Sequence, residues 1–209
     1  MIPRRTLGIA ALSLLLVLSG AEAWGSAADL DARLAKRLDP PLLTEVRAIV
    51  ASAQAESLPE EPLVLRSLEG AAKGASPPQI LEALRVLLGH LRVARAALGQ
   101  DAAVDALRAG ADALAAGVDS TTVAGFAPGA ASRATVVGLV VLSDLVTRGV
   151  PAPLAAHGLR AMIAAGTAEL EFLDLRSAVE RDIAKGTAPS RAMEKRIESM
   201  MRDLPLERR

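Results

Sequence analysis

Residues 76–98 read SPPQILEALRVLLGHLRVARAAL, and this stretch decides the fold class. Ser76 can cap a helix, prolines fill the first turn, and Gln79 stands three residues after the serine, which is the pattern of a capping box. Apolar residues then recur every three or four positions, while polar residues such as Arg85 and Arg92 fall on the other side. The stretch therefore predicts an amphipathic helix with one face against a core and one face in water.

Helical patterns continue on both sides of this stretch. The spacing of apolar residues predicts helices near residues 27–38, 101–116, 135–146, 152–165, 168–185 and 189–202, with shorter ones between Asp39 and Lys73. Residues 135–146 are apolar on almost every side, so we expect them to form the buried central helix. Their β-branched residues leave a strand as the alternative there, but no alternating pattern and no partner strand occur elsewhere in the sequence.

Glycines stand at the ends of several of these predicted helices. The joints are Lys73-Gly74, Ala116-Gly117, Arg148-Gly149, Ala165-Gly166 and Lys185-Gly186. Glycine reaches the left-handed conformation without steric cost, so each joint predicts a tight turn between helices. The joints follow no fixed period, which favours an irregular arrangement over a solenoid. The sequence thus predicts an all-α fold, an irregular multi-helix bundle or stack of about eight helices joined by glycine-terminated tight turns.

Composition narrows the possible partners. The chain has 209 residues, no cysteine and no tyrosine, and its aromatic residues are Trp24, Phe126 and Phe172. The core is therefore aliphatic, disulfides and thiolate sites are excluded, and few aromatic planes remain on which bases or sugars could stack. The formal net charge is zero, so no long-range field attracts the protein to an anionic polymer. We expect no nucleic-acid partner.

The first 23 residues have the pattern of a secretory signal peptide. Arg4 and Arg5 precede an apolar run from Leu7 to Leu18, and a small-x-small cleavage site ends at Ala23. The run has about 12 residues, whereas a membrane-spanning helix needs roughly 20, so an uncleaved anchor is the alternative and a span after removal is not expected. The arginine pair leaves the twin-arginine route open. The sequence predicts export to the periplasm or the medium, with cleavage near Ala23.

Domain organisation follows from this leader. Removal of residues 1–23 leaves a chain long enough to close one hydrophobic core. We expect a single α-helical domain over residues 24–203 and a frayed tail over residues 204–209.

A seven-residue block over residues 68–74 contains two glycines and precedes a proline-containing helix start. Leu68-Glu69-Gly70-Ala71-Ala72-Lys73-Gly74 is followed by Ser76-Pro77-Pro78-Gln79-Ile80. In this Glu-Gly-x-x-Lys-Gly block and the proline-containing helix start after it, the chain resembles uncharacterised exported bacterial α-helical proteins. The resemblance covers residues 59–98 and implies no activity, because no function is known for those proteins.

Glu69 and Lys73 are candidate contact residues within this block. A charge beside a glycine inside a short helix is unusual, because Gly70 costs roughly 1 kcal/mol relative to alanine there. Either Gly70 lets two helices touch while Glu69 pairs with Lys73 one turn later, or a ligand approaches at this point.

Arginines and histidines supply the other candidates. Arg85 and Arg92, with Arg95, lie on the exposed side of one predicted helix and either meet an acidic partner or are solvated. His90 lies at the border of the apolar face of the same helix, and His157 lies opposite the apolar face of its own helix. Neither histidine has a second ligand at metal-site spacing, and no nucleophile motif occurs, so we predict no catalytic residue, cofactor or metal.

Three functional hypotheses remain. The first is a non-catalytic interaction or envelope-associated module that acts through protein contacts. The second is an enzyme or small-ligand binder whose site combines distant residues such as Glu69, His90 and Asp174. In the third, the protein forms a homo-oligomer through the apolar residues of its last helix, which are Met193, Ile197, Met200 and Met201.

Overall fold

A computed structural model describes residues 27–203, and every regular element in that range is helical. The predicted all-α class is confirmed. The range contains ten α-helices and one 3-10 helix, where the sequence predicts about eight helices. Their bounds are α1 Ala27–Ala35, α2 Pro40–Ala55, α3 Glu61–Ala72, α4 Pro77–Leu98, α5 Val104–Ala115, α6 Ser120–Ala124, η1 Ala127–Gly129, α7 Arg133–Thr147, α8 Ala152–Ala164, α9 Glu169–Ala184 and α10 Pro189–Asp203.

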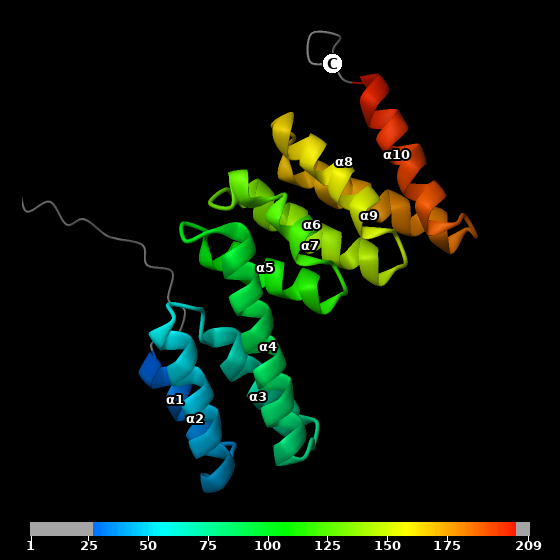
Figure 1. Cartoon of the computed structure of the whole chain (residues 1–209). Helices are drawn as coiled ribbons and strands as arrows, with labels where there is room; N and C mark the ends of the chain where they lie inside the picture. Colours follow the sequence, from blue (N-terminus) through cyan, green and yellow to red (C-terminus); the bar gives the residue numbers. More distant parts are fainter. Residues whose placement is uncertain (1–26, 204–209) are drawn as a thin grey trace, which may run out of the picture.

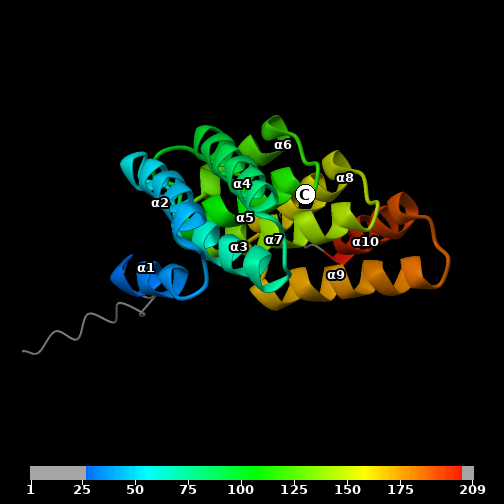
Figure 2. The same cartoon turned by 90° about the horizontal axis from the view of Figure 1, so that it is seen from below.

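The helices form two groups that share one long helix (Figure 1). The first group, α1 to α3, packs against the first part of α4, and the second group runs from α5 to α10. A view turned by 90° separates α1 and α2 from α8 and α10 in the same way (Figure 2). The molecule therefore has two ends, and α4 joins them.

Each group has its own apolar core. The N-terminal core includes Leu34, Val46, Leu63, Leu84 and Leu91, none more than 2% exposed. The C-terminal core surrounds α7, and its largest buried side chains are Leu107, Leu139, Leu142, Leu145, Leu159, Phe172 and Met193. The expected buried central helix is thus α7, which contacts α5, α8 and α9.

Helix α4 owes its position in both cores to its length and its start. Ser76 and Gln79 form the predicted capping box, and Oε1 of Gln79 accepts a hydrogen bond of 2.9 Å from the backbone N–H of Ser76. The 22-residue helix then contributes Ile80 to the N-terminal core and Leu98 to the C-terminal core. At about 1.5 Å per residue it is roughly 33 Å long, enough to span both groups.

The glycine of one joint shows how the turns are built. Gly117 has φ 93°, and the N–H of Val118 donates a hydrogen bond of 3.0 Å to the carbonyl of Ala113, which lies in the helix just completed. This backbone geometry is typical of a Schellman ending, and Val118 packs back into the C-terminal core. The glycines that follow α3, α7, α8 and α9 have φ values between 69° and 91°.

The helix start predicted near residue 101 differs from the observed one. The helix expected near 101–116 begins at Val104, with Ala103 at its N-cap, and the N–H of Ala103 donates a hydrogen bond of 3.1 Å to the carbonyl of Ala130. Asp39 occupies the N-cap position of α2, but its side chain forms no capping hydrogen bond. The leader predicted over 1–23 and the tail predicted over 204–209 lie outside the described residues. Within residues 27–203, no helix combines the length and apolarity needed to cross a bilayer.

Candidate functional site

A groove of about 430 Å³ lies between α3, α4 and α5. We call it the α3–α5 groove. Its lining includes Leu65, Arg66 and Glu69 from α3, Val86, Leu87 and His90 from α4, and Arg108 and Asp112 from α5. The three helices meet here because α3 and α5 both pack along α4. The groove thus combines apolar, cationic, anionic and imidazole groups from separate parts of the sequence.

The apolar part of the groove is open to solvent. Leu65 is 38% exposed and Val86 is 48% exposed, although both belong to helices that bury an apolar face elsewhere. Apolar side chains outside the buried face of a helix add little buried apolar area to the core. Both side chains line a hollow together with charged groups, and this combination occurs in ligand-binding sites.

Glu69 is held by two cations. Its carboxylate oxygens lie 2.5 Å from Nζ of Lys73 and 3.1 Å from Nη1 of Arg66. The hydrogen bonds from Lys73 and Arg66 lower the pKa of Glu69 below its ordinary value. Glu69 is therefore a stable anion and a weak base, which makes it a poor proton acceptor in catalysis.

Gly70, next to Glu69, permits the close approach of α3 to the start of α4. A Cβ atom at this position would lie 2.8 Å from Cγ1 of Ile80, which is closer than real side chains come. The unusual Glu-Gly pair thus has a structural explanation in both of its residues: the glycine allows a tight helix contact, and the glutamate pairs with Lys73 one turn later.

Asp112 differs from Glu69 in having no hydrogen-bonded partner for its carboxylate among residues 27–203. Although the residue as a whole is exposed, burial around its carboxyl group raises the pKa above the ordinary value, while the charges of Arg108 and Arg66 lower it by less. Arg108 itself points its Nη1 to Glu61 at 3.0 Å. Asp112 is therefore a partly desolvated acceptor that remains open to a ligand.

The structure brings together two of the three residues of the distant-site hypothesis. Glu69 and His90 line the same groove, and His90 is half-buried, with no hydrogen bond from its ring within the described range. Asp174 is an exposed residue of α9, in the other group of helices, and does not line the groove. The predicted combination of all three is therefore wrong, because α9 packs on α7 and α10 rather than on α3 or α4.

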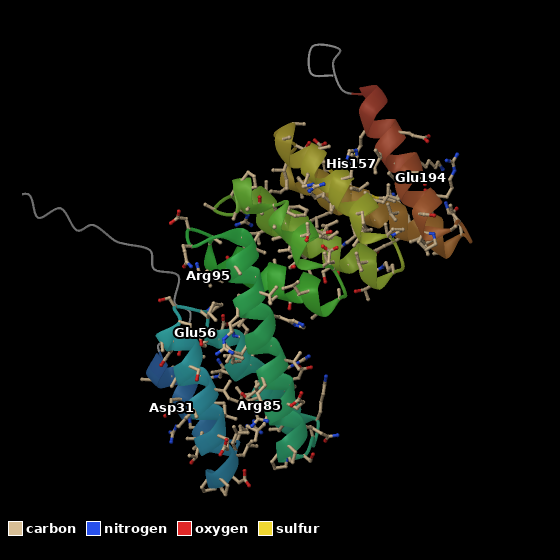
Figure 3. The ribbon with its side chains drawn as sticks, viewed as in Figure 1. Asp31, Glu56, Arg85, Arg95, His157 and Glu194 are labelled. Atoms are coloured by element: carbon tan, nitrogen blue, oxygen red, sulfur yellow. The ribbon has the colours of Figure 1, made fainter. Side chains whose placement is uncertain are left out.

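The arginines of α4 have separate surroundings. Arg92 binds Glu56 through two hydrogen bonds of 2.7 and 2.6 Å, and Arg95 donates to the carbonyls of Ser57 and Gln100. Arg85 is exposed and has no ion pair in residues 27–203 (Figure 3). A continuous arginine row for an acidic partner is therefore not present, because two of its members are engaged within the chain.

The remaining sequence candidates lie far from the groove. Figure 3 shows His157 on α8, in the second group of helices, where it is exposed. In α10, Met193 is fully buried and packs against Gly158 of α8, where a Cβ atom would lie only 2.9 Å from Cε of Met193. Ile197 packs against the same glycine. The side chain of Met201 lies outside the described residues. Self-association through α10 stays a prediction.

Sequence reasoning missed most of the groove. Leu65 and Val86 could have been found from the sequence, since each is an apolar residue outside the buried face of its helix. Asp112 and Arg108 could not, because no pattern in the sequence of α5 indicates that this helix lies near α3.

Among residues 27–203, no cluster of three metal-binding side chains occurs. In comparisons with family models, curated proteins and solved structures, nothing matches this chain. The resemblance drawn from the Glu69-Gly70 block therefore stays a prediction.

Proposed function

We propose that the protein is an exported helical binding module without catalysis of its own, and that the α3–α5 groove is its binding surface. The observation that carries the proposal is the exposure of Leu65 and Val86 beside the unpartnered carboxylate of Asp112. Apolar contact supplies affinity, and a desolvated polar group supplies orientation.

The groove also indicates what kind of partner fits. Leu65 and Val86 would be covered by an apolar side chain, and Asp112 would accept a hydrogen bond from a backbone N–H or a basic side chain. Glu69 and Arg108 are already neutralised by Lys73 and Glu61, so neither selects a partner by a bare charge. These requirements are met by a segment of another protein that carries an apolar residue next to a donor group.

Export is supported by the leader pattern of residues 1–23. The test is to fractionate cells that produce the full chain and to measure the mass of the recovered protein. We expect a product outside the inner membrane that begins near Trp24. An uncleaved chain in the cytosol would contradict this part of the proposal.

Binding at the groove is tested by site-specific photocrosslinking in the native cell. A photoreactive residue replaces Val86 in one variant and Leu170 in the control, because Leu170 is an apolar residue of α9 that is 72% exposed and distant from the groove. We expect a crosslinked partner from position 86 and not from position 170. Equal capture from both positions would exclude a specific groove.

The captured partner then allows a direct measurement. With purified proteins, Val86→Asp should weaken binding roughly tenfold or more, since it places a charge in the apolar contact, and Leu170→Asp should leave the affinity unchanged. Circular dichroism confirms that both variants are folded. Unchanged affinity of Val86→Asp would overturn the assignment.

A small-ligand or catalytic site is the second candidate, favoured by the presence of Glu69 and His90 in one groove. The pairing of Glu69 with Lys73 and Arg66 counts against a role as a base. A thermal-shift screen of small metabolites distinguishes the two candidates. A metabolite that raises the melting temperature of the wild type, but not of Glu69→Gln or His90→Gln, would favour the small-ligand or catalytic site. A partner protein that binds both variants as tightly as the wild type would favour the binding module.

A further inference from the structure

Three cations lie together at the end of α1. Arg33 is in the last turn of the helix, and Lys36 and Arg37 follow directly after it. All three are exposed, and within residues 27–203 none of their side chains forms a hydrogen bond or an ion pair. Most other cations of the described range are paired with carboxylates, among them Arg47, Arg66, Lys73, Arg92, Arg108, Arg133, Arg176 and Arg196.

The three cations surround a pocket of about 480 Å³. Its remaining lining is apolar and comes from α3, through Leu68, Ala71 and Ala72. No acidic residue of the described range lines it. The pocket lies on a different face of α3 from the α3–α5 groove, which α3 lines through Leu65, Arg66 and Glu69.

Two carboxylates near this cluster are paired with other cations. Asp31, in the same helix, is held by Arg47 of α2 through two hydrogen bonds of 2.6 and 2.7 Å, which lower its pKa. Glu69, on the adjacent helix, is held by Lys73 and Arg66. Because no carboxylate of the described range lines the pocket, three positive charges lie beside one hollow in a chain whose overall charge is zero.

We infer that this pocket binds a phosphate ester, with the phosphate between Arg33, Lys36 and Arg37 and the attached carbon atoms against Leu68. Guanidinium and ammonium groups form short, charge-assisted hydrogen bonds to phosphate oxygens, and two arginines with one lysine provide enough donors for several oxygens at once. The apolar floor fits an organic substituent better than a free inorganic ion. For an exported protein the ester is either a lipid headgroup of the envelope or a soluble organic phosphate.

The inference does not depend on the α3–α5 groove. The two sites have different linings and opposite chemistry, since the groove offers an open carboxylate and the pocket offers three open cations. The proposal for the groove and the inference for the pocket can therefore be tested independently.

Two probes test the pocket on the purified protein in the form that the cell produces. Glycerol 3-phosphate is titrated by calorimetry, and vesicles of phosphatidylglycerol and phosphatidylcholine are tested by cosedimentation, with pure phosphatidylcholine vesicles as the uncharged reference. The test variant combines Arg33→Gln, Lys36→Gln and Arg37→Gln. The control combines Arg85→Gln, Arg181→Gln and Lys185→Gln, which removes the same charge from exposed positions elsewhere.

We expect the wild-type protein to bind at least one probe and the test variant to lose that binding. For the anionic vesicles the loss should be roughly 100-fold, because each basic residue near such a surface contributes about a fivefold factor. Binding of vesicles alone identifies a lipid headgroup, and binding of glycerol 3-phosphate identifies a soluble ester. The inference is overturned if the wild type binds neither probe, if the test variant binds as well as the wild type, or if the control loses as much as the test variant.

Discussion

Nη2 of Arg95 donates a hydrogen bond of 2.9 Å to the backbone carbonyl of Ser57, the one non-glycine residue in 27–203 with positive φ, at 54°. A left-handed backbone costs a non-glycine residue roughly 1–2 kcal/mol, so it persists only where its surroundings hold it. One turn earlier on α4, Arg92 holds Glu56 through two hydrogen bonds. The two arginines thus fix the turn that leads from α2 to α3, and with it one wall of the α3–α5 groove.

Replacement of Arg95 should therefore destabilise the protein. Arg95→Ala removes a charged guanidinium group that donates one hydrogen bond to the carbonyl of Ser57 and one to the carbonyl of Gln100. We expect the free energy of unfolding to fall by about 1.5–3 kcal/mol, measured by urea denaturation. The matched control is Arg85→Ala on the same helix, where an exposed side chain without an ion pair should change the value by less than about 0.5 kcal/mol. If both substitutions lowered the free energy of unfolding equally, Arg95 would not stabilise the turn between α2 and α3.

Two glycines should respond to alanine with opposite signs. A methyl group at Gly70 would lie 2.8 Å from Cγ1 of Ile80, whereas at Gly89, in the interior of α4, nothing lies within 4 Å. Alanine gains roughly 1 kcal/mol of helix propensity at either position, but crowding costs about 1–3 kcal/mol at Gly70. Thermal unfolding should show that Gly89→Ala stabilises the protein and that Gly70→Ala destabilises it by about 1 kcal/mol. Stabilisation by both would show that α3 and α4 are not in close contact.

The same helices show how far the sequence alone could predict the structure. The start of α4 at Pro77 and its end at Leu98 follow from capping chemistry and apolar spacing, which act within a few residues of each other. The groove depends instead on which faces of α3, α4 and α5 meet. Asp112 and Arg66 are 46 positions apart, and no local pattern relates them. The hypothesis that combines Asp174 with Glu69 and His90 fails for the same reason, because no local pattern indicates which group of helices contains α9.

Acid should weaken the contact between α9 and α10 at Asp182. Burial raises the pKa of this carboxyl group, but the hydrogen bond from Arg196 and the charges of Arg196, Lys195 and Lys185 together lower it below 3.8. A lowered pKa stabilises the fold above pH 3.8, and the contribution is lost as the pH falls through the folded value. Asp182→Asn should therefore lower the free energy of unfolding at neutral pH.

The pH dependence separates this effect from general damage. Urea denaturation of the wild type and of Asp182→Asn is compared at neutral pH and at the lowest pH at which both fold. The difference should shrink toward acid, because the wild-type carboxylate becomes protonated there. A difference that stays constant across the range would mean that the ion pair with Arg196 does not contribute.

Asp112 should show the opposite dependence. Burial raises the pKa of its carboxyl group above the ordinary value of 3.8, and the opposing charges of Arg108 and Arg66 do not cancel the increase. For a raised pKa, the stabilising contribution is complete below pH 3.8 and is lost as the pH rises through the folded value, so the ionised group opposes folding at neutral pH. Asp112→Asn removes this penalty, and its melting temperature should exceed that of the wild type at neutral pH and approach it in acid.

The consequence for binding follows from the same substitution. We propose that Asp112 contacts the partner, and residues of binding sites commonly reduce the stability of the free protein. Asp112→Asn should therefore be more stable than the wild type and bind the captured partner less tightly. The control is Asp174→Asn, an exposed change on α9 outside the groove, which should affect neither property to a similar degree. A variant at position 112 that gains stability and keeps its full affinity for the partner would remove Asp112 from the binding surface.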